Sequence, residues 1–83
     1  MKYTVYMLKS EIKNWFYVGM TGNIEERLKR HNSGQVKSTK SYKPYTLILQ
    51  KEFEARIDAR DYEKFLKIRS NKEKILKQLG YKK

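Results

Sequence analysis

The sequence predicts an α+β fold, in which a three-stranded, mainly antiparallel sheet is flanked by three helices in the order β-β-α-β-α-α. Two observations predict this class. In residues 3–10 apolar residues occupy alternate positions, as in a strand. In residues 24–32 apolar residues recur at helical spacing, and a helix-capping sequence precedes them. The 83 residues are expected to form one domain, residues 1–83, with a small core.

The first two strands are expected at residues 3–10 and 15–20, joined by a hairpin loop at residues 11–14, which makes the pair antiparallel. Both faces of the first strand carry apolar side chains, so we expect both faces of the sheet to be covered at least in part. Gly19 lies inside the second strand. A glycine there is expected to have a structural role, as a bulge or as a point where another group approaches the backbone closely.

The first helix is expected at residues 24–32. Asn23 precedes it as a good N-cap, and Glu26 follows three positions later, as in a capping box. Helical spacing places Arg27 and His31 on the same side as the apolar residues of this helix. Both side chains are therefore expected to border the buried face and not to point into bulk solvent.

Residues 35–44 are expected to form a loop with three lysines and no acidic residue, namely Lys37, Lys40 and Lys43. These charges have two interpretations, a solvated loop or an arm that binds the backbone of a nucleic acid. The third strand is expected to follow the loop, at residues 45–53.

Two further helices are expected after the third strand. The first of them covers residues 59–69, with Asp58 as its cap. The last helix begins after Ser70, and Glu73 completes a capping box of the S-x-x-E type. Both segments carry apolar residues at helical spacing, so we expect each to bury one face.

The chain is strongly basic, with 20 Lys and Arg residues against 9 Asp and Glu residues and a formal net charge of +11. This charge predicts a polyanionic partner, and nucleic acid is the commonest one. A membrane surface would call for a basic amphipathic helix, whereas the basic residues here are spread over the whole chain. Since no run of 18 apolar residues and no apolar signal segment occurs, the expected location is cytoplasmic, without a membrane partner.

The sequence contains no cysteine and one histidine. A disulfide partner, a Cys-based metal site and a multi-His zinc site are therefore excluded. A hydrolytic metal site in this chain would need an oxygen ligand, and Glu63 is the best candidate because it lies at the edge of a buried helical arc. Glu63 has a second interpretation, an ordinary ion pair with Lys67 four residues later.

Three other residues suit the cleavage of a phosphodiester bond. Arg27 offers a guanidinium that matches phosphate oxygens. Tyr6 and Tyr17 lie on adjacent predicted strands, and a phenol beside an arginine can act as a general base, although a strand tyrosine is more often a packing residue. His31 is open to two interpretations, a buried histidine with satisfied hydrogen bonds or an acid/base group near phosphate.

The spacing of these residues resembles the GIY-YIG nuclease domain, in particular its small stand-alone bacterial members. The resemblance covers residues 3–79, and its second motif is the most specific part. The residues that carry it are Val5-Tyr6-Met7, Tyr17-Val18-Gly19, Arg27, His31 and Glu63.

This resemblance implies metal-dependent hydrolysis of DNA, with one Mg²⁺ or Mn²⁺ ion held by Glu63. It implies catalytic roles for Tyr6, Tyr17 and Arg27, with His31 assisting. One tyrosine takes a proton from the attacking water, and Tyr17 is slightly preferred because it is nearer in sequence to the helix of Arg27. Branched, nicked or damaged DNA is the expected substrate, as in repair or recombination.

Lys67 joins the lysines of the 35–44 loop as an expected contact to nucleic acid. The chain departs from the family pattern at Thr4, where the first motif has glycine, and at Met20, where some members carry a lysine that assists catalysis. Two other functions therefore stay open. One is a non-catalytic nucleic-acid-binding module that kept the nuclease fold, and the other is a domain that binds an acidic protein.

Overall fold

The computed structural model of the chain describes residues 2–81. Its elements follow the order β-β-α-β-α-α that the sequence predicts, with one added turn of 3₁₀ helix (η1) in the lysine-rich loop. The elements are β1 (Tyr3–Ser10), β2 (Phe16–Thr21), α1 (Ile24–Asn32), η1 (Lys40–Tyr42), β3 (Tyr45–Phe53), α2 (Arg56–Lys67) and α3 (Arg69–Gln78). The predicted fold class is confirmed.

The sheet has the strand order β2-β1-β3, and both neighbours of β1 run antiparallel to it. Both faces of β1 carry apolar side chains because helices pack on both faces of the sheet. A register shift between Met7 and Leu8 places an extra residue, Ile48, in β3. Because of this bulge, Ile48 and its neighbour Leu49 both pack against the same core cluster.

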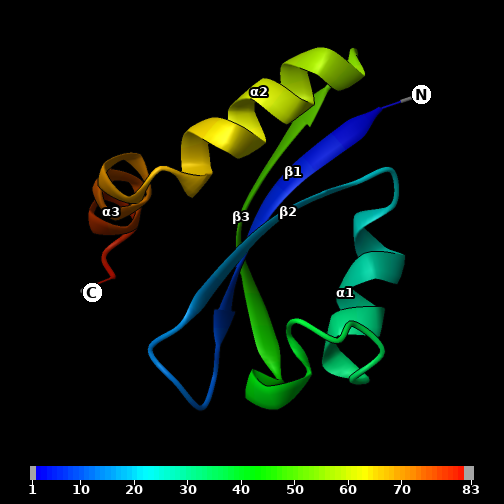
Figure 1. The fold of residues 1–83 in the computed structure, drawn as a ribbon, viewed down its shortest axis with the longest axis vertical. Coiled ribbons are helices and arrows are strands. Elements are labelled where there is room, and N and C mark those ends of the chain that lie inside the picture. Colours follow the sequence, from blue (N-terminus) through cyan, green and yellow to red (C-terminus); the bar gives the residue numbers. More distant parts are fainter. Residues whose placement is uncertain (1, 82–83) are drawn as a thin grey trace.

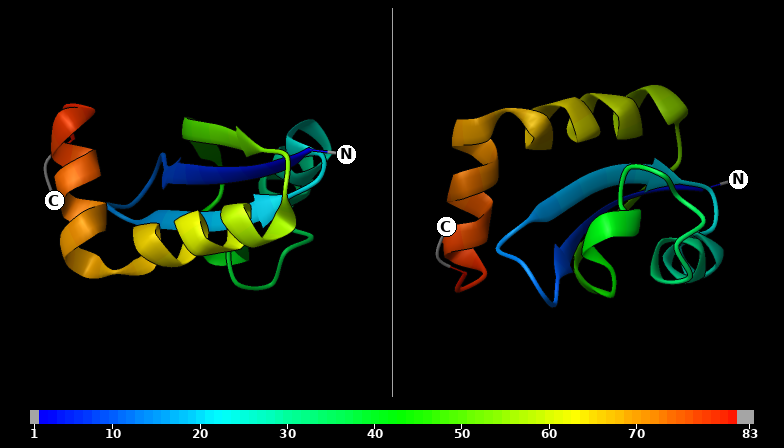
Figure 2. Two further views of the ribbon diagram at one scale, coloured as in Figure 1. Left: turned by 90° about the horizontal axis from the view of Figure 1, so that it is seen from above. Right: turned by 60° about the horizontal axis from the view of Figure 1, so that its bottom comes forward.

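Helices cover the two faces of the sheet separately. Helix α1 contributes Ile24 and Leu28 to one face, whereas α2 contributes Ala59 and Leu66 to the other. Figures 1 and 2 show the sheet between these two helices, with α3 turned away from α2 at the far end of the molecule. The main core lies on the α2 side.

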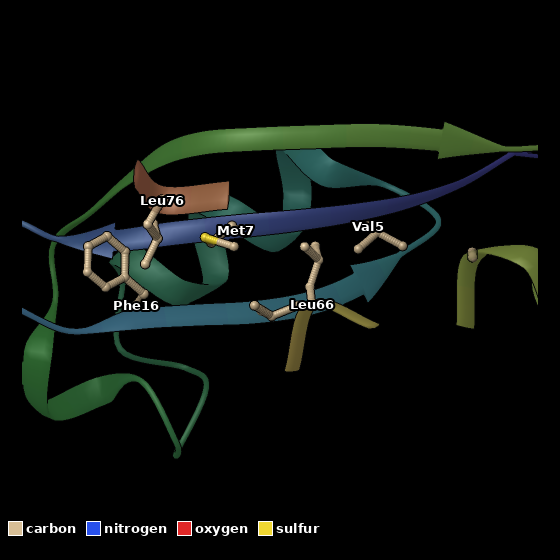
Figure 3. Close-up of a cluster of buried hydrophobic side chains, with 7 residues drawn as sticks. Val5, Met7, Phe16, Leu66 and Leu76 are labelled. Atoms are coloured by element: carbon tan, nitrogen blue, oxygen red, sulfur yellow. The ribbon is translucent and has the colours of Figure 1, made fainter. Parts of the chain in front are cut away.

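That core is built around alternate residues of β1. Val5 and Met7 are fully buried there, and Phe16 of β2 and Leu66 of α2 close over them (Figure 3). Leu76 of α3 completes the cluster, at 2% exposure. Each such side chain contributes about 1.5–3 kcal/mol on burial, so the sheet is fixed mainly from this side.

Local signals define α1 as predicted. The side chain of Asn23 accepts a hydrogen bond from the backbone N–H of Glu26 at 3.1 Å, and the helix runs from Ile24 to Asn32. Acidic residues stand in its first turn and basic residues in its last turn, which suits the helix dipole.

The predicted starts of α2 and α3 are wrong. Helix α2 begins at Arg56, so Asp58 lies inside the first turn and does not cap it. Helix α3 begins at Arg69 after a single break at Ile68, so Ser70 lies within the helix, and Glu73 forms an ion pair with Arg69 at 3.2 Å. In both cases the residue before the helix forms no capping hydrogen bond with its side chain. The connection to the preceding element is short, so the helix begins before the residue that was expected to cap it.

Candidate active site

Tyr6 and Tyr17 lie on the α1 face of the sheet. In the register of β1 and β2, Tyr6 is opposite Gly19 and Leu8 is opposite Tyr17, so the two tyrosines are diagonal neighbours. Their ring centroids are 6.3 Å apart. Tyr6 is 1% exposed, whereas Tyr17 is half-buried, so only Tyr17 has appreciable contact with solvent.

A chain of buried hydrogen bonds holds the Tyr6 hydroxyl. It is 2.8 Å from His31 Nε2, and His31 Nδ1 is 2.8 Å from Thr39 Oγ1. Thr39 Oγ1 donates its proton to the carbonyl oxygen of Val36 at 3.3 Å, so it accepts the proton of His31 Nδ1. His31 Nε2 is then the acceptor, and the Tyr6 hydroxyl donates to it. The observed hydrogen bonds thus match the interpretation of His31 as a buried, satisfied histidine.

The burial of this chain affects both titrating groups. Desolvation, together with the positive charges of Arg27 and Arg30, lowers the pKa of His31 to about 4, so the ring is neutral at pH 7. Desolvation also raises the pKa of Tyr6, and the nearby Tyr17 adds to this effect. Two charges act on the same hydroxyl in opposite directions, since Arg27 lowers the pKa of Tyr6 and Glu63 raises it.

The pKa of His31 predicts a pH-dependent stability. The unfolded chain binds a proton near pH 6.5 and the folded chain only near pH 4, so the unfolded state binds more protons between these values. The free energy of unfolding is therefore highest above about pH 6.5. It decreases by about 3 kcal/mol as the pH falls towards 4. Urea unfolding across this range is expected to show the loss.

A direct measurement of this titration is available because the chain has one histidine. The ring protons of His31 in NMR spectra of the folded protein are expected to shift with a midpoint near pH 4. A midpoint near 6.5 in the folded protein would contradict the buried, neutral ring.

Gly19 is the surface against which the Tyr6 ring packs. A Cβ atom added to Gly19 would lie 2.5 Å from Tyr6 Oη and 2.7 Å from its Cζ. Ordinary side chains do not approach so closely, and the Tyr6 ring has little freedom to move because His31 holds its hydroxyl. The backbone of Gly19 therefore has the close-approach role that the sequence suggests.

We expect Gly19→Ala to displace the Tyr6 ring and to weaken its hydrogen bond to His31. Overpacking of this kind costs about 1–3 kcal/mol, which chemical denaturation will measure. Gly22→Ala is the matched control, because a Cβ at Gly22 meets no atom within 4 Å. Equal stability of the two variants would contradict the packing described for Tyr6.

Arg27 projects from α1 at the edge of this aromatic group and is half-buried. Its charge acts on both Tyr6 and His31. Among residues 2–81, the ion pairs involve other basic residues, so no carboxylate neutralises the guanidinium. The guanidinium can therefore accept a phosphate without first losing a protein partner.

Glu63 approaches from the other layer, since α2 packs on the opposite face of the sheet from α1. Its side chain is 19% exposed and forms an ion pair with Lys67 at 3.5 Å, the alternative that the sequence left open. Its charge also raises the pKa of Tyr6, so it reaches the aromatic group electrostatically. No cluster of three acidic or histidine residues suited to a metal occurs in the described part of the chain, so Glu63 would be a single protein ligand.

The predicted nucleic-acid contacts fall in two places. Lys37, Lys40 and Lys43 are exposed on the loop that contains η1. This loop is fixed beside the aromatic group because Thr39, which is fully buried, binds His31 through its hydroxyl and accepts a hydrogen bond from Tyr45 Oη at 2.8 Å through its carbonyl oxygen. Lys67 is separate from this loop, next to Glu63.

Sequence reasoning missed Thr39 and Trp15. Thr39 stands in a polar loop, where nothing in the sequence marks it as buried. Trp15 packs against Tyr17 and Tyr42, with ring centroids 6.2 Å and 5.2 Å away. Its position two residues before Tyr17 was a usable signal, because alternate residues of an extended segment share a face.

Known proteins resemble this chain in sequence and fold. The model of the GIY-YIG catalytic domain matches residues 2–76, and the chain therefore belongs to the GIY-YIG family. It is 35% identical over 75 residues to a UPF0213 protein of Staphylococcus haemolyticus, covering 89% of this chain and 90% of that one. It is 33% identical over 72 residues to the UPF0213 protein YazA of Bacillus subtilis, covering 86% and 72% of the two chains.

A solved structure has the same fold. The solution NMR structure of the UPF0213 protein BH0048 from Bacillus halodurans superposes with a TM-score of 0.59 at 28% identity, covering 94% of this chain and 85% of that one. The family is thus a nuclease-like one, and the relatives named here carry only the UPF0213 designation. No helix among the described residues has the length and apolar character to cross a membrane.

Proposed function

We propose that this protein hydrolyses phosphodiester bonds of DNA with the help of a divalent cation. The observation that supports this most strongly is the cluster of Tyr6, Tyr17 and His31, whose ring centroids lie 5.0 to 6.3 Å apart. Arg27, on the helix of His31, and Glu63 of α2 both influence the Tyr6 hydroxyl electrostatically. Outside an active site, folding alone gives little reason to assemble two phenols, a guanidinium without a carboxylate partner and a carboxylate on a basic protein.

The residues fit a divalent cation of the Mg²⁺ type. Such an ion takes oxygen ligands and tolerates one protein carboxylate when waters and substrate phosphate fill its other positions. Glu63 offers that carboxylate, half-buried and close enough to influence Tyr6. When bound, the cation would polarise the phosphate and stabilise the leaving oxygen. Lys67 would give up its ion pair with Glu63 and contact a phosphate.

The side chains of the site have separate roles in the reaction. Arg27 binds the non-bridging oxygens of the scissile phosphate and stabilises the charge that grows there. Tyr17, the more exposed phenol, contacts the attacking water, and its oxygen accepts the water's proton as its own proton passes to solvent. The water oxygen bonds to phosphorus as the bond to the sugar oxygen breaks, and solvent protonates that oxygen. Tyr6 is a positioning residue, because His31 fixes its ring beside Tyr17.

The lysines of the η1 loop supply sequence-independent affinity for the DNA backbone. Lys37, Lys40 and Lys43 are exposed beside the aromatic group, and the net charge of +11 supports long-range attraction. Since such contacts read the backbone and not the bases, we infer that recognition follows DNA structure more than sequence, as at nicks or branches.

Cleavage assays test this proposal directly. Duplex, nicked and branched DNA are incubated with Mg²⁺, with Mn²⁺ or with a chelator. We expect products only with metal. Binding of all three substrates without cleavage under any metal would reject catalysis and leave a nucleic-acid-binding module. Affinity that does not change between low and moderate salt would reject the phosphate contacts as well.

A further inference from the structure

Helix α2 carries apolar side chains on two of its sides. Ala59 and Leu66 face the sheet and are fully buried. Ile57 and Phe65 lie on the outer side of the helix and are 69% and 44% exposed, and Ile68, directly after its last residue, is 55% exposed. Helical spacing places these three residues along one stripe, which we call the outer stripe. The right-hand view of Figure 2 shows no other element of the described chain over this side of α2.

The segment around the outer stripe is nearly neutral, unlike the rest of the chain. Residues 52–68 contain five acidic and four basic residues, whereas the whole chain has 9 acidic and 20 basic residues. Two copies of so basic a chain repel each other, and this segment is where they can approach with the least repulsion. The same balance of charge makes the outer stripe a poor surface for a nucleic acid, which needs an excess of basic groups.

The outer side of α2 is complementary to a second copy of itself. Asp61 and Lys64 lie between Ile57 and Ile68 on this side, and both are exposed. In an antiparallel pair of α2 helices related by a two-fold axis, Ile57 lies opposite Ile68 of the second copy and Asp61 lies opposite its Lys64, because both pairs are centred on the same point of the helix. Neither Asp61 nor Lys64 forms an ion pair within the described part of the chain, so both charges are available to a partner.

We propose that the outer stripe is a homodimer interface, in which the α2 helices of two copies pack antiparallel about a two-fold axis. Phe65 flanks the contact, and its ring is already stacked on Tyr62, with ring centroids 5.9 Å apart. A ring that is held in place before association loses less conformational entropy on binding. Because α2 has 12 residues and is therefore about 18 Å long, the interface is small and the dimer is weak, with a dissociation constant in the micromolar range.

A second copy fits this surface better than other partners do. An acidic protein would be attracted to the lysines of the η1 loop and not to the nearly neutral surface of α2. A membrane surface would call for basic residues on both sides of the apolar stripe. The charged residues beside the outer stripe are instead of both signs, and the two-fold axis places opposite charges against each other at its centre.

This dimer leaves both candidate active sites uncovered. Glu63 is two residues away from Asp61 and therefore lies on another side of α2. Tyr6 and Tyr17 lie on the α1 face of the sheet, whereas α2 packs on the opposite face. The inference is thus independent of the proposed function. A monomeric protein that cleaves DNA would overturn the dimer alone, and a dimer without cleavage would support the interface while rejecting catalysis.

Sedimentation velocity without DNA or metal tests the proposal on the unmodified protein. We expect the weight-average sedimentation coefficient to rise with protein concentration across the micromolar range. Ile57→Lys is expected to weaken the dimer at least about tenfold, because it removes an apolar contact twice and adds charge to the interface. Ile12→Lys is the matched control, since Ile12 is 58% exposed in the hairpin loop between β1 and β2. A monomer at all concentrations, or equal weakening by the two variants, would overturn the proposal.

A charge exchange tests the antiparallel arrangement. Asp61→Lys places two lysines opposite each other at two symmetric positions and is expected to weaken the dimer about tenfold. Lys64→Asp is expected to weaken it similarly, although it lowers the net charge of the chain, so a general effect of charge is distinguished from the pairing. The two substitutions together restore opposite charges and are expected to restore the dimer. A double variant as weak as the single ones, or single variants that dimerise normally, would overturn the antiparallel α2 interface.

Discussion

Replacing Arg27 with alanine is expected to lower metal-dependent DNA cleavage about 10³-fold while leaving the fold intact. The guanidinium has no carboxylate partner among the described residues, so its removal leaves no buried charge unpaired. Its proposed role is to match phosphate oxygens whose charge grows as the water attacks, an interaction made mainly in the transition state. Single-turnover cleavage rates measure this loss without interference from product release.

Arg30→Ala provides the matched control. Arg30 lies on the same helix, carries the same charge and is exposed. Its removal is expected to weaken DNA binding slightly and to leave the cleavage rate of bound DNA nearly unchanged. If both variants lose activity equally, Arg27 acts only through the net charge. If Arg27→Ala cleaves at the normal rate, the assigned role is wrong.

Sequence reasoning succeeded where a single local signal was decisive. Asn23 satisfies a backbone donor at the start of α1, and that bond depends only on residues three positions apart, so the helix boundaries followed from the sequence. The strands of the sheet were equally predictable. β1 alternates apolar residues on two faces, and each face has its own helix.

The starts of α2 and α3 were not predictable in this way. Both helices begin after an apolar residue, Ala55 or Ile68, whose side chain forms no capping hydrogen bond. Asp58 and Ser70 are good capping residues by type, but each lies inside a helix that begins two residues or one residue earlier, and no capping signal in the sequence marks the earlier start.

The candidate site, too, could be predicted from the sequence only in part. The sequence placed Tyr6, Tyr17 and Arg27 in one candidate site, but the hydrogen bond between Thr39 and His31 is seen only in the folded structure. A threonine in a lysine-rich loop carries no signal of burial. Its role depends on contacts between residues eight positions apart that no local pattern records.

Hydrogen bonds connect the lysine-rich loop, α1 and β1, and they hold the site in place. Thr39 ties the lysine loop to His31, and His31 ties α1 to Tyr6 in the central strand. Arg27 lies on that same helix, one turn before His31. Arg27, the proposed phosphate ligand, and His31, which holds the Tyr6 hydroxyl, are therefore fixed by the same short helix, which keeps their separation constant.

Glu63→Gln is expected to lower the cleavage rate about 10²–10⁴-fold, because the amide keeps the shape of the side chain but is a poor ligand for Mg²⁺. Stability should change by less than about 1 kcal/mol, since the ion pair that it breaks involves Lys67, whose side chain is 57% exposed. Isothermal titration with Mn²⁺ in the presence of DNA measures the metal directly.

Asp61→Asn is the matched control for Glu63→Gln. It removes one carboxylate from the same helix at an exposed position, so the change in net charge is identical. Metal binding lost only in Glu63→Gln would identify the ligand, whereas equal loss in both variants would indicate a diffuse effect of charge. If Glu63→Gln retains both metal binding and cleavage, then Glu63 serves only its ion pair with Lys67, and the metal-dependent mechanism has no protein ligand among the described residues.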